Sequence, residues 1–112
     1  MKISDVISAI GAELICGDAD KDFEGVYVGD LLSRAMSCVE SDNLWITIMS
    51  NANVVAVAVL TEPAAVILAE GVKLPEDCLL NARNNGVTVL SSPLSAYEIC
   101  IKLYKHSAEA LK

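Results

Sequence analysis

The sequence predicts an α/β fold, in which a single layered domain (residues 1–112) holds a largely parallel sheet of about four to five strands covered by helices. Short apolar runs alternate along the chain with segments whose apolar residues recur at helical spacing, as in the strand–helix units of a parallel sheet. The residues are 54% hydrophobic but only 4% aromatic. The core is therefore expected to consist of Val, Ile, Leu and Ala, which suit a sheet covered on both faces.

The strands are expected where short apolar runs lie between turn signals. A helix over residues 4–10 and a short strand over residues 13–16 come first. Four strand–helix units follow, with strands at residues 25–28, 44–49, 64–69 and 87–90. Parallel strands that follow one another must be joined by right-handed crossovers.

The helices that follow these strands carry their own end signals. Residues 30–39 place apolar side chains at helical spacing, with Asp30 as the N-cap. Residues 75–85 begin with a proline and acidic residues and are followed by Gly86, the asymmetry expected of a helix.

The last helix is expected to begin at a capping box formed by Ser95 and Glu98. Tyr97 and Tyr104 are seven residues apart and share one helical face, which packs either on the sheet or on a second subunit. Residues 107–112 are expected to be a frayed tail or simply the end of this helix.

Residues 53–71 (NVVAVAVLTEPAAVILAEG) are the most ambiguous part of the chain. A membrane span is excluded because Thr61, Glu62 and Pro63 interrupt the apolar run, and a span needs about 20 apolar residues. A hairpin fits the β-branched residues at alternate positions, and a helix fits the alanines and the polar residues that can cap it. The surrounding strand–helix alternation favours a helix over residues 52–60, wholly core or partly interfacial, and a strand over residues 64–69.

Charge and composition exclude several classes of partner. The net charge is −7 and the eight Lys and Arg residues are scattered, so neither nucleic acid nor an anionic membrane surface is expected to bind. The first 14 residues contain Asp5 and too short an apolar run for a signal peptide, so we expect a cytoplasmic protein. Cys16, Cys38, Cys78 and Cys100 form no C-x-x-C pair and are expected to be reduced, buried thiols.

Residues for catalysis are scarce. The one histidine, His106, lies near the C-terminus with Lys102 and Lys105, where it is expected to interact with a helix end. Neither a G-x-x-x-x-G-K-[ST] loop nor a G-x-G-x-x-G motif is present. No enzyme activity, cofactor or metal site is therefore expected.

Polar turns should gather at the edge of the sheet where the parallel strands end, because ligands of α/β proteins bind there. Helix N-termini at this edge offer backbone donors to an anion. The alternative is that these residues only cap helices and form turns. The candidate ligand-binding residues are Gly29, Asp30, Ser50, Asn51, Asn53, Glu70, Gly71, Ser91 and Ser92.

The order of several strings resembles the DRTGG domain over nearly the whole chain. V-x-D-L-L-S, W-I-T and N-V-V-A-V-A occur in sequence at residues 28–33, 45–47 and 53–58, and look most like the stand-alone versions of that domain. The resemblance implies a fold similar to the N-terminal domain of HPr kinase/phosphorylase. Related domains are appended to long-form phosphotransacetylases and to pyrophosphatases with cystathionine-β-synthase-type (CBS) domains, where they regulate or assemble the protein, and the family brings no catalytic residues.

The chain departs from the motifs for which the family is named. The Asp-Arg pair falls around residues 49–53, where this chain has Met-Ser-Asn-Ala-Asn. The Thr-Gly-Gly motif falls on residues 69–71, where only Gly71 remains. Loss of the arginine removes the obvious clamp for an anion.

The sequence therefore predicts a non-catalytic regulatory or interaction module that forms a homodimer and docks to a partner protein. The alternative is a sensor that binds a nucleotide or another phosphorylated metabolite at the turn-rich edge of the sheet. A sensor should hold Asn51, Asn53, Gly71 and Ser91 around one open cavity. An interaction module should close that edge and expose an apolar patch elsewhere.

Overall fold

Five short strands form one sheet in the order β1-β5-β4-β3-β2 in the computed structural model, which describes the backbone of residues 1–110 and the side chains of residues 1–107. The strands β2 (Val26–Val28), β3 (Leu44–Thr47), β4 (Ala65–Leu68) and β5 (Val89–Ser91) are parallel to one another. The strand β1 (Glu13–Cys16) pairs antiparallel with β5 at one edge. The predicted α/β fold with a largely parallel sheet is confirmed.

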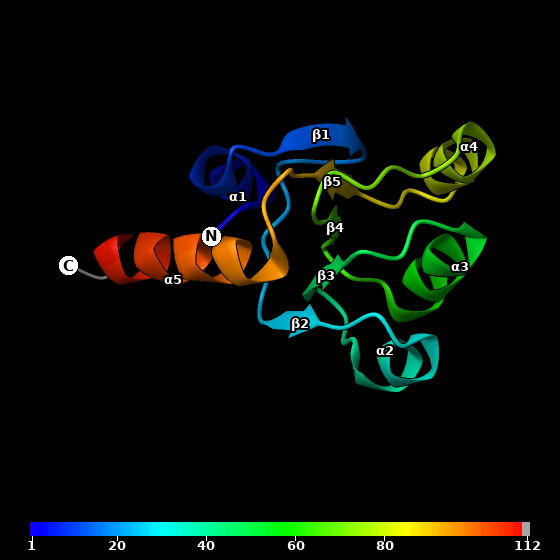
Figure 1. The fold of residues 1–112 in the computed structure, drawn as a ribbon, viewed down its shortest axis with the longest axis horizontal. Helices are drawn as coiled ribbons and strands as arrows, with labels where there is room; N and C mark the ends of the chain where they lie inside the picture. The colour runs from blue at the N-terminus through cyan, green and yellow to red at the C-terminus, as the bar shows by residue number, and fades with distance from the viewer. Residues whose placement is uncertain (111–112) are drawn as a thin grey trace.

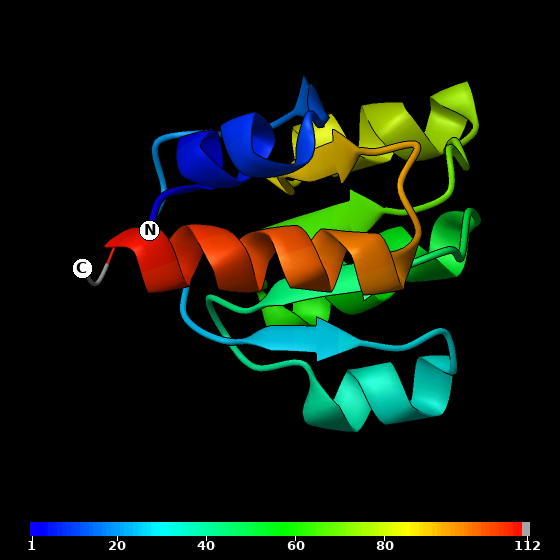
Figure 2. The same ribbon diagram turned by 60° about the vertical axis from the view of Figure 1, so that its left-hand side comes forward.

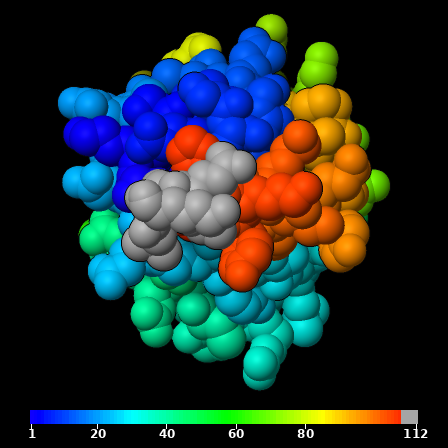
Figure 3. Space-filling model, turned by 90° about the vertical axis from the view of Figure 1, so that its left-hand side faces the viewer, coloured from blue at the N-terminus to red at the C-terminus, as the bar shows by residue number. Residues whose placement is uncertain are grey.

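Helices cover both faces of this sheet (Figures 1 and 2). One layer contains α2 (Leu32–Cys38), α3 (Ala52–Thr61) and α4 (Glu76–Asn84), and the other contains α1 (Ile3–Ile10) and α5 (Ala96–Ala110). Figure 3 shows α1 and α5 side by side on the outside of their layer. Of the predicted tail, residues 107–110 continue α5, and residues 111–112 lie outside the described residues.

Alternate residues of the central strands point into the two helical layers. Trp45 of β3 packs with the α2–α4 layer, whereas its neighbours Leu44 and Ile46 pack with α1 and α5. Every residue of β3 and β4 is buried. This double burial explains why these strands are almost entirely apolar instead of alternating with polar residues.

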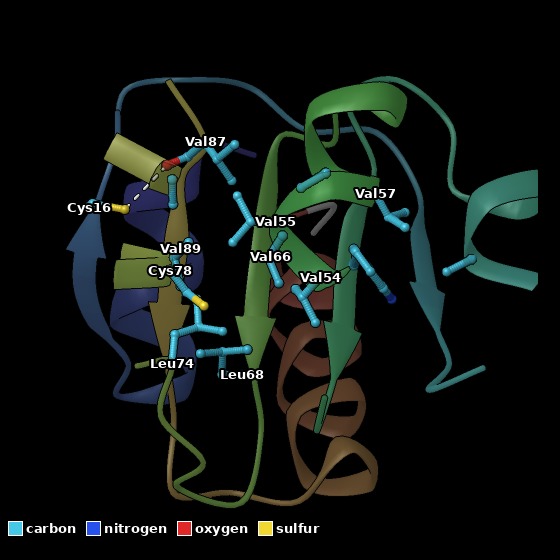
Figure 4. Packing of buried hydrophobic residues seen from close by; sticks show 14 of the residues in the cluster. Cys16, Val54, Val55, Val57, Val66, Leu68, Leu74, Cys78, Val87 and Val89 are labelled. Atoms are coloured by element: carbon cyan, nitrogen blue, oxygen red, sulfur yellow. Dashed lines mark hydrogen bonds between the residues drawn. The ribbon is translucent and has the colours of Figure 1, made fainter. Parts of the chain in front are cut away.

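The ambiguous stretch forms α3 followed by β4, so the hairpin alternative is wrong. The side chain of Asn51 caps α3 by accepting a hydrogen bond from the backbone N–H of Asn53 at 3.0 Å. Val54 and Val55 of the helix point towards the sheet near Val66 of β4 (Figure 4). The opposite side of α3 is open, since Leu60 is 70% exposed, and the helix is not wholly core.

The edge strand β1 contains a bulge. Leu14 lies opposite Leu90 of β5, but Cys16 lies opposite Val89, so the register shifts between Leu14 and Cys16. Ile15 and Cys16 both pack against the cluster on the α2–α4 side, which strict alternation would forbid. The bulge therefore turns one more side chain of β1 towards α4.

The four cysteines are free thiols in this structure. Cys16 and Cys78 are buried as predicted, but Cys38 and Cys100 are only half-buried. Burial raises the pKa of the Cys16 thiol and of the Cys78 thiol, and the negative charge of Asp77 raises that of Cys78 further. These thiols act as small apolar side chains at neutral pH.

Among the described residues, no helix is both long enough and apolar enough to cross a bilayer.

Gly17, directly after β1, is expected to tolerate no side chain. Its φ angle is 102°, and an added Cβ would overlap the backbone and side chain of Thr88. We expect Gly17→Ala to lower the free energy of unfolding by about 2–5 kcal/mol. Gly11 is the matched control because its φ is 63° but no atom lies within 4 Å of an added Cβ, so Gly11→Ala should cost about 1–2 kcal/mol. Urea unfolding followed by Trp45 fluorescence measures both, and equal losses would contradict the overlap.

Candidate functional site

All nine candidate residues lie at one edge of the sheet or at the helix start beside it. The residues after β2 and β3 are on one half of this edge, and those after β4 and at the end of β5 are on the other half. The first half carries Gly29, Asp30, Ser50, Asn51 and Asn53, and the second half carries Glu70, Gly71, Ser91 and Ser92.

Asp30 joins the ends of β2 and β3. Its Oδ1 accepts hydrogen bonds from the hydroxyl of Thr47 and from the backbone N–H of Ile48, both at 2.8 Å. The N-cap of α2 is Leu31, and no side chain caps that helix. The prediction that Asp30 caps the helix is therefore wrong, because its carboxylate is already bound across the two strands.

Gly29 and the start of α3 are also fixed by internal hydrogen bonds. The carbonyl of Gly29 accepts a hydrogen bond from the Trp45 indole N–H at 3.1 Å, and its own N–H donates to the carbonyl of Ile46. The side-chain oxygen of Asn51 caps α3 by accepting from the backbone N–H of Asn53. Ser50 is part-exposed and Asn53 is exposed.

The turns after β4 and β5 hold one another. Glu70 and Gly71 both adopt left-handed backbone conformations, with φ of 59° and 72°. Their N–H groups donate to the carbonyls of Leu94 and Ser92, at 2.8 and 2.9 Å. The hydroxyl of Ser92 in turn accepts a hydrogen bond from the N–H of Leu94 at 3.2 Å. These interactions tie the turn after β4 to the segment after β5.

A cavity of about 200 Å³ lies next to the turn after β4. Of the nine candidate residues, only Ser91 lines it, so the candidates do not surround one common cavity. The lining comes from β1, β4, β5, the segment after Gly71 and the first turns of α4. The lining residues are Glu13, Ile15, Leu68, Val72, Lys73, Leu74, Leu79 and Ser91.

Sequence reasoning missed most of this lining for two reasons. Glu13 and Ile15 belong to the antiparallel strand β1, whose position beside β5 depends on tertiary pairing. Lys73 lies in a connection without regular structure, which carries no periodic signal. The one available sequence signal was Gly71, because glycine often marks a left-handed turn such as the one that Glu70 and Gly71 form.

An exposed apolar surface lies on the other face of the sheet. We call it the α5–β2 surface. Val26 and Val28 of the edge strand are 45% and 48% exposed, and Tyr97 and Tyr104 of α5 are both 76% exposed. The exposure of the two tyrosines excludes their packing on the sheet. A shallow groove between the two elements is lined in part by Phe23, Cys100 and Tyr104. The α5–β2 surface consists of Phe23, Val26, Val28, Tyr97, Cys100 and Tyr104.

Metal binding finds no support among the described residues, where no three His, Cys, Asp or Glu side chains come together as ligands. Among the described residues an ion pair joins Lys2 to Asp20 at 3.2 Å, and the hydrogen bond to Asp20 raises the pKa of the Lys2 amine.

A family model described as the DRTGG domain matches residues 5–105. The chain belongs to the DRTGG domain family. This membership confirms the resemblance drawn from the sequence. No curated protein sequence matches the chain.

Among solved structures, this DRTGG domain is similar to the CBS and DRTGG domains of the regulatory region of Clostridium perfringens pyrophosphatase, complexed with its activator diadenosine tetraphosphate. The TM-score is 0.75 at 13% sequence identity, and the match covers 94% of this chain and 46% of that chain. The likeness shows a shared fold. The present chain spans about half the length of that regulatory region.

Removing the Asp30 carboxylate should destabilise the domain. The hydroxyl of Thr47 is buried and would lose its acceptor, so we expect Asp30→Ala to lower the free energy of unfolding by about 1–3 kcal/mol. Asp30→Asn keeps an acceptor oxygen and should cost less. Glu40→Ala, on an exposed loop, is the control. Urea unfolding of the three variants measures the differences. An Asp30→Ala variant as stable as the Glu40→Ala control would contradict a structural role for this carboxylate.

Proposed function

We propose that this DRTGG domain is a non-catalytic regulatory module that acts by self-association and by docking to another protein. The observation that carries the proposal is the α5–β2 surface, where large apolar side chains from a strand and a helix are exposed together. Exposed apolar patches of this kind mark interaction sites in small domains.

The partner in self-association is a second copy of the chain. The strand β2 is at the edge of the sheet, so one of its two sides has no neighbouring strand. Val26 and Val28 pair in register with Leu44 and Ile46, whose side chains pack with α5. The two valines therefore point to the same side as α5. Antiparallel pairing of β2 with its copy would continue the sheet and bring both α5–β2 surfaces together around a two-fold axis.

Docking to another protein uses surfaces that this dimer leaves free. Leu60 at the end of α3 and Leu80 of α4 are exposed on the opposite layer. The similar solved structure supports a regulatory role, since its DRTGG domain is part of the regulatory region of an enzyme.

A second candidate function is sensing of a small molecule. The cavity at the β4–β5 half of the edge favours it, because ligands of α/β proteins bind beyond the carboxyl ends of the strands. The activator bound by the regulatory region of the pyrophosphatase gives this candidate additional support. In a sensor, ligand binding would change the affinity of self-association.

Self-association is tested by the molar mass in solution. We expect light scattering at micromolar concentrations to give twice the chain mass of 11.9 kDa. Val28→Lys places a charge in the interface and should weaken the dimer at least about tenfold, a loss of roughly 1.4 kcal/mol. Leu80→Lys, at an exposed leucine on the other layer, should leave the dimer intact.

Two results would contradict the proposal. One is a wild-type mass of 11.9 kDa at every concentration. The other is equal dissociation by Val28→Lys and Leu80→Lys, because charge anywhere on the domain would then have the same effect.

A further inference from the structure

The cavity beside Ser91 has an aliphatic interior. Five of its lining residues are Ile15, Leu68, Val72, Leu74 and Leu79, and none is aromatic. Figure 4 shows Leu68 and Leu74 lying close together at this end of the sheet. The volume of about 200 Å³ is below the roughly 300–1,000 Å³ of pockets for drug-sized ligands. The interior therefore suits an aliphatic group of the size of a leucine or isoleucine side chain.

Two backbone features border this space. The bulge in β1 brings Cys16 to the α4 side of the sheet together with Ile15, which lines the cavity. The left-handed turn at Glu70 and Gly71, anchored to the residues after β5, leads the chain across the ends of β4 and β5 to the buried side chain of Leu74. Both features belong to the fold of the described residues.

The polar groups of the cavity are few and of different kinds. Glu13 supplies a carboxylate and Lys73 an ammonium group, and both residues are exposed at the mouth. Ser91 is half-buried and supplies a hydroxyl, which donates and accepts hydrogen bonds. Glu13 and Ser91 lie directly opposite one another in the β1–β5 pairing. The cavity thus offers one acceptor for a cation, one donor for an anion and no net charge.

We propose that this cavity binds an aliphatic α-amino acid in its zwitterionic form. The side chain of the ligand occupies the aliphatic interior, its ammonium group pairs with Glu13, and its carboxylate pairs with Lys73. This inference rests on the second candidate function and gives it a site and a ligand class.

The charges favour a zwitterion over a nucleotide. The phosphates of a nucleotide bring at least about two negative charges at neutral pH. At the mouth of the cavity they would meet one cation and one carboxylate, on a chain whose net charge is −7. An amino acid instead matches each charge of the mouth with an opposite one.

The experiment is a titration of the whole, isotope-labelled chain with L-leucine, followed by NMR of the backbone amides. We expect the amides of residues 13–15, 72–74 and 91 to shift. Leucinamide lacks the carboxylate and 4-methylpentanoate lacks the ammonium group, and each should bind at least about tenfold more weakly, the loss of one charge pair.

Two variants assign the charges separately. Lys73→Ala should weaken leucine but not leucinamide, and Glu13→Gln should weaken leucine but not 4-methylpentanoate. Both residues are exposed, so the fold should persist. Lys102 is an exposed lysine on α5, and Lys102→Ala is the matched control. This variant should bind leucine and leucinamide as tightly as the wild-type chain does.

Each alternative result overturns a defined part of the inference. If AMP or inorganic phosphate shifts the same amide signals and leucine does not, the proposed ligand class, an aliphatic amino acid, is overturned. No shift with any probe, or leucine shifts outside these residues, would overturn the site. Leucine binding without any change in molar mass would support the site and contradict sensing through self-association. The molar mass of the ligand-free chain tests self-association independently.

Discussion

Burial of β3 and β4 on both faces is the constraint on which the rest of the structure depends. Strands without a polar face need a helical layer on each side. In the part of the chain that the structure describes, three helices supply one layer, and α1 and α5 alone supply the other. Two helices do not extend across five strands (Figure 2). The apolar side chains of β2 beside α5 are therefore left exposed, and the α5–β2 surface is a consequence of how the central strands are covered.

The two halves of the carboxyl edge differ because their strands differ. Between β2 and β3, the carboxylate of Asp30 and the cap at Asn51 satisfy the polar groups locally, so this half is closed. Beside β5 the neighbouring strand is antiparallel and bulged. Its first residues reach the same edge and leave the cavity there.

The two proposed binding regions lie on opposite faces of the sheet. The α5–β2 surface is on the α1–α5 side, whereas Glu13, Ile15 and Ser91 line the cavity on the α4 side. The proposed ligand and the proposed second copy of the chain would therefore not compete for the same surface. Separate sites allow both to be occupied at once, so that one can change the affinity for the other.

The sequence by itself determined the order and type of the elements. Their apolar periodicity and end signals, such as the capping box of Ser95 and Glu98, are local and do not depend on distant contacts. Tertiary structure alone decided that Asp30 bonds to Thr47, that β1 is bulged against β5, and that Glu13 and Lys73 line the same cavity. Each of these joins residues far apart in the chain, and local patterns carry no information about which distant groups meet.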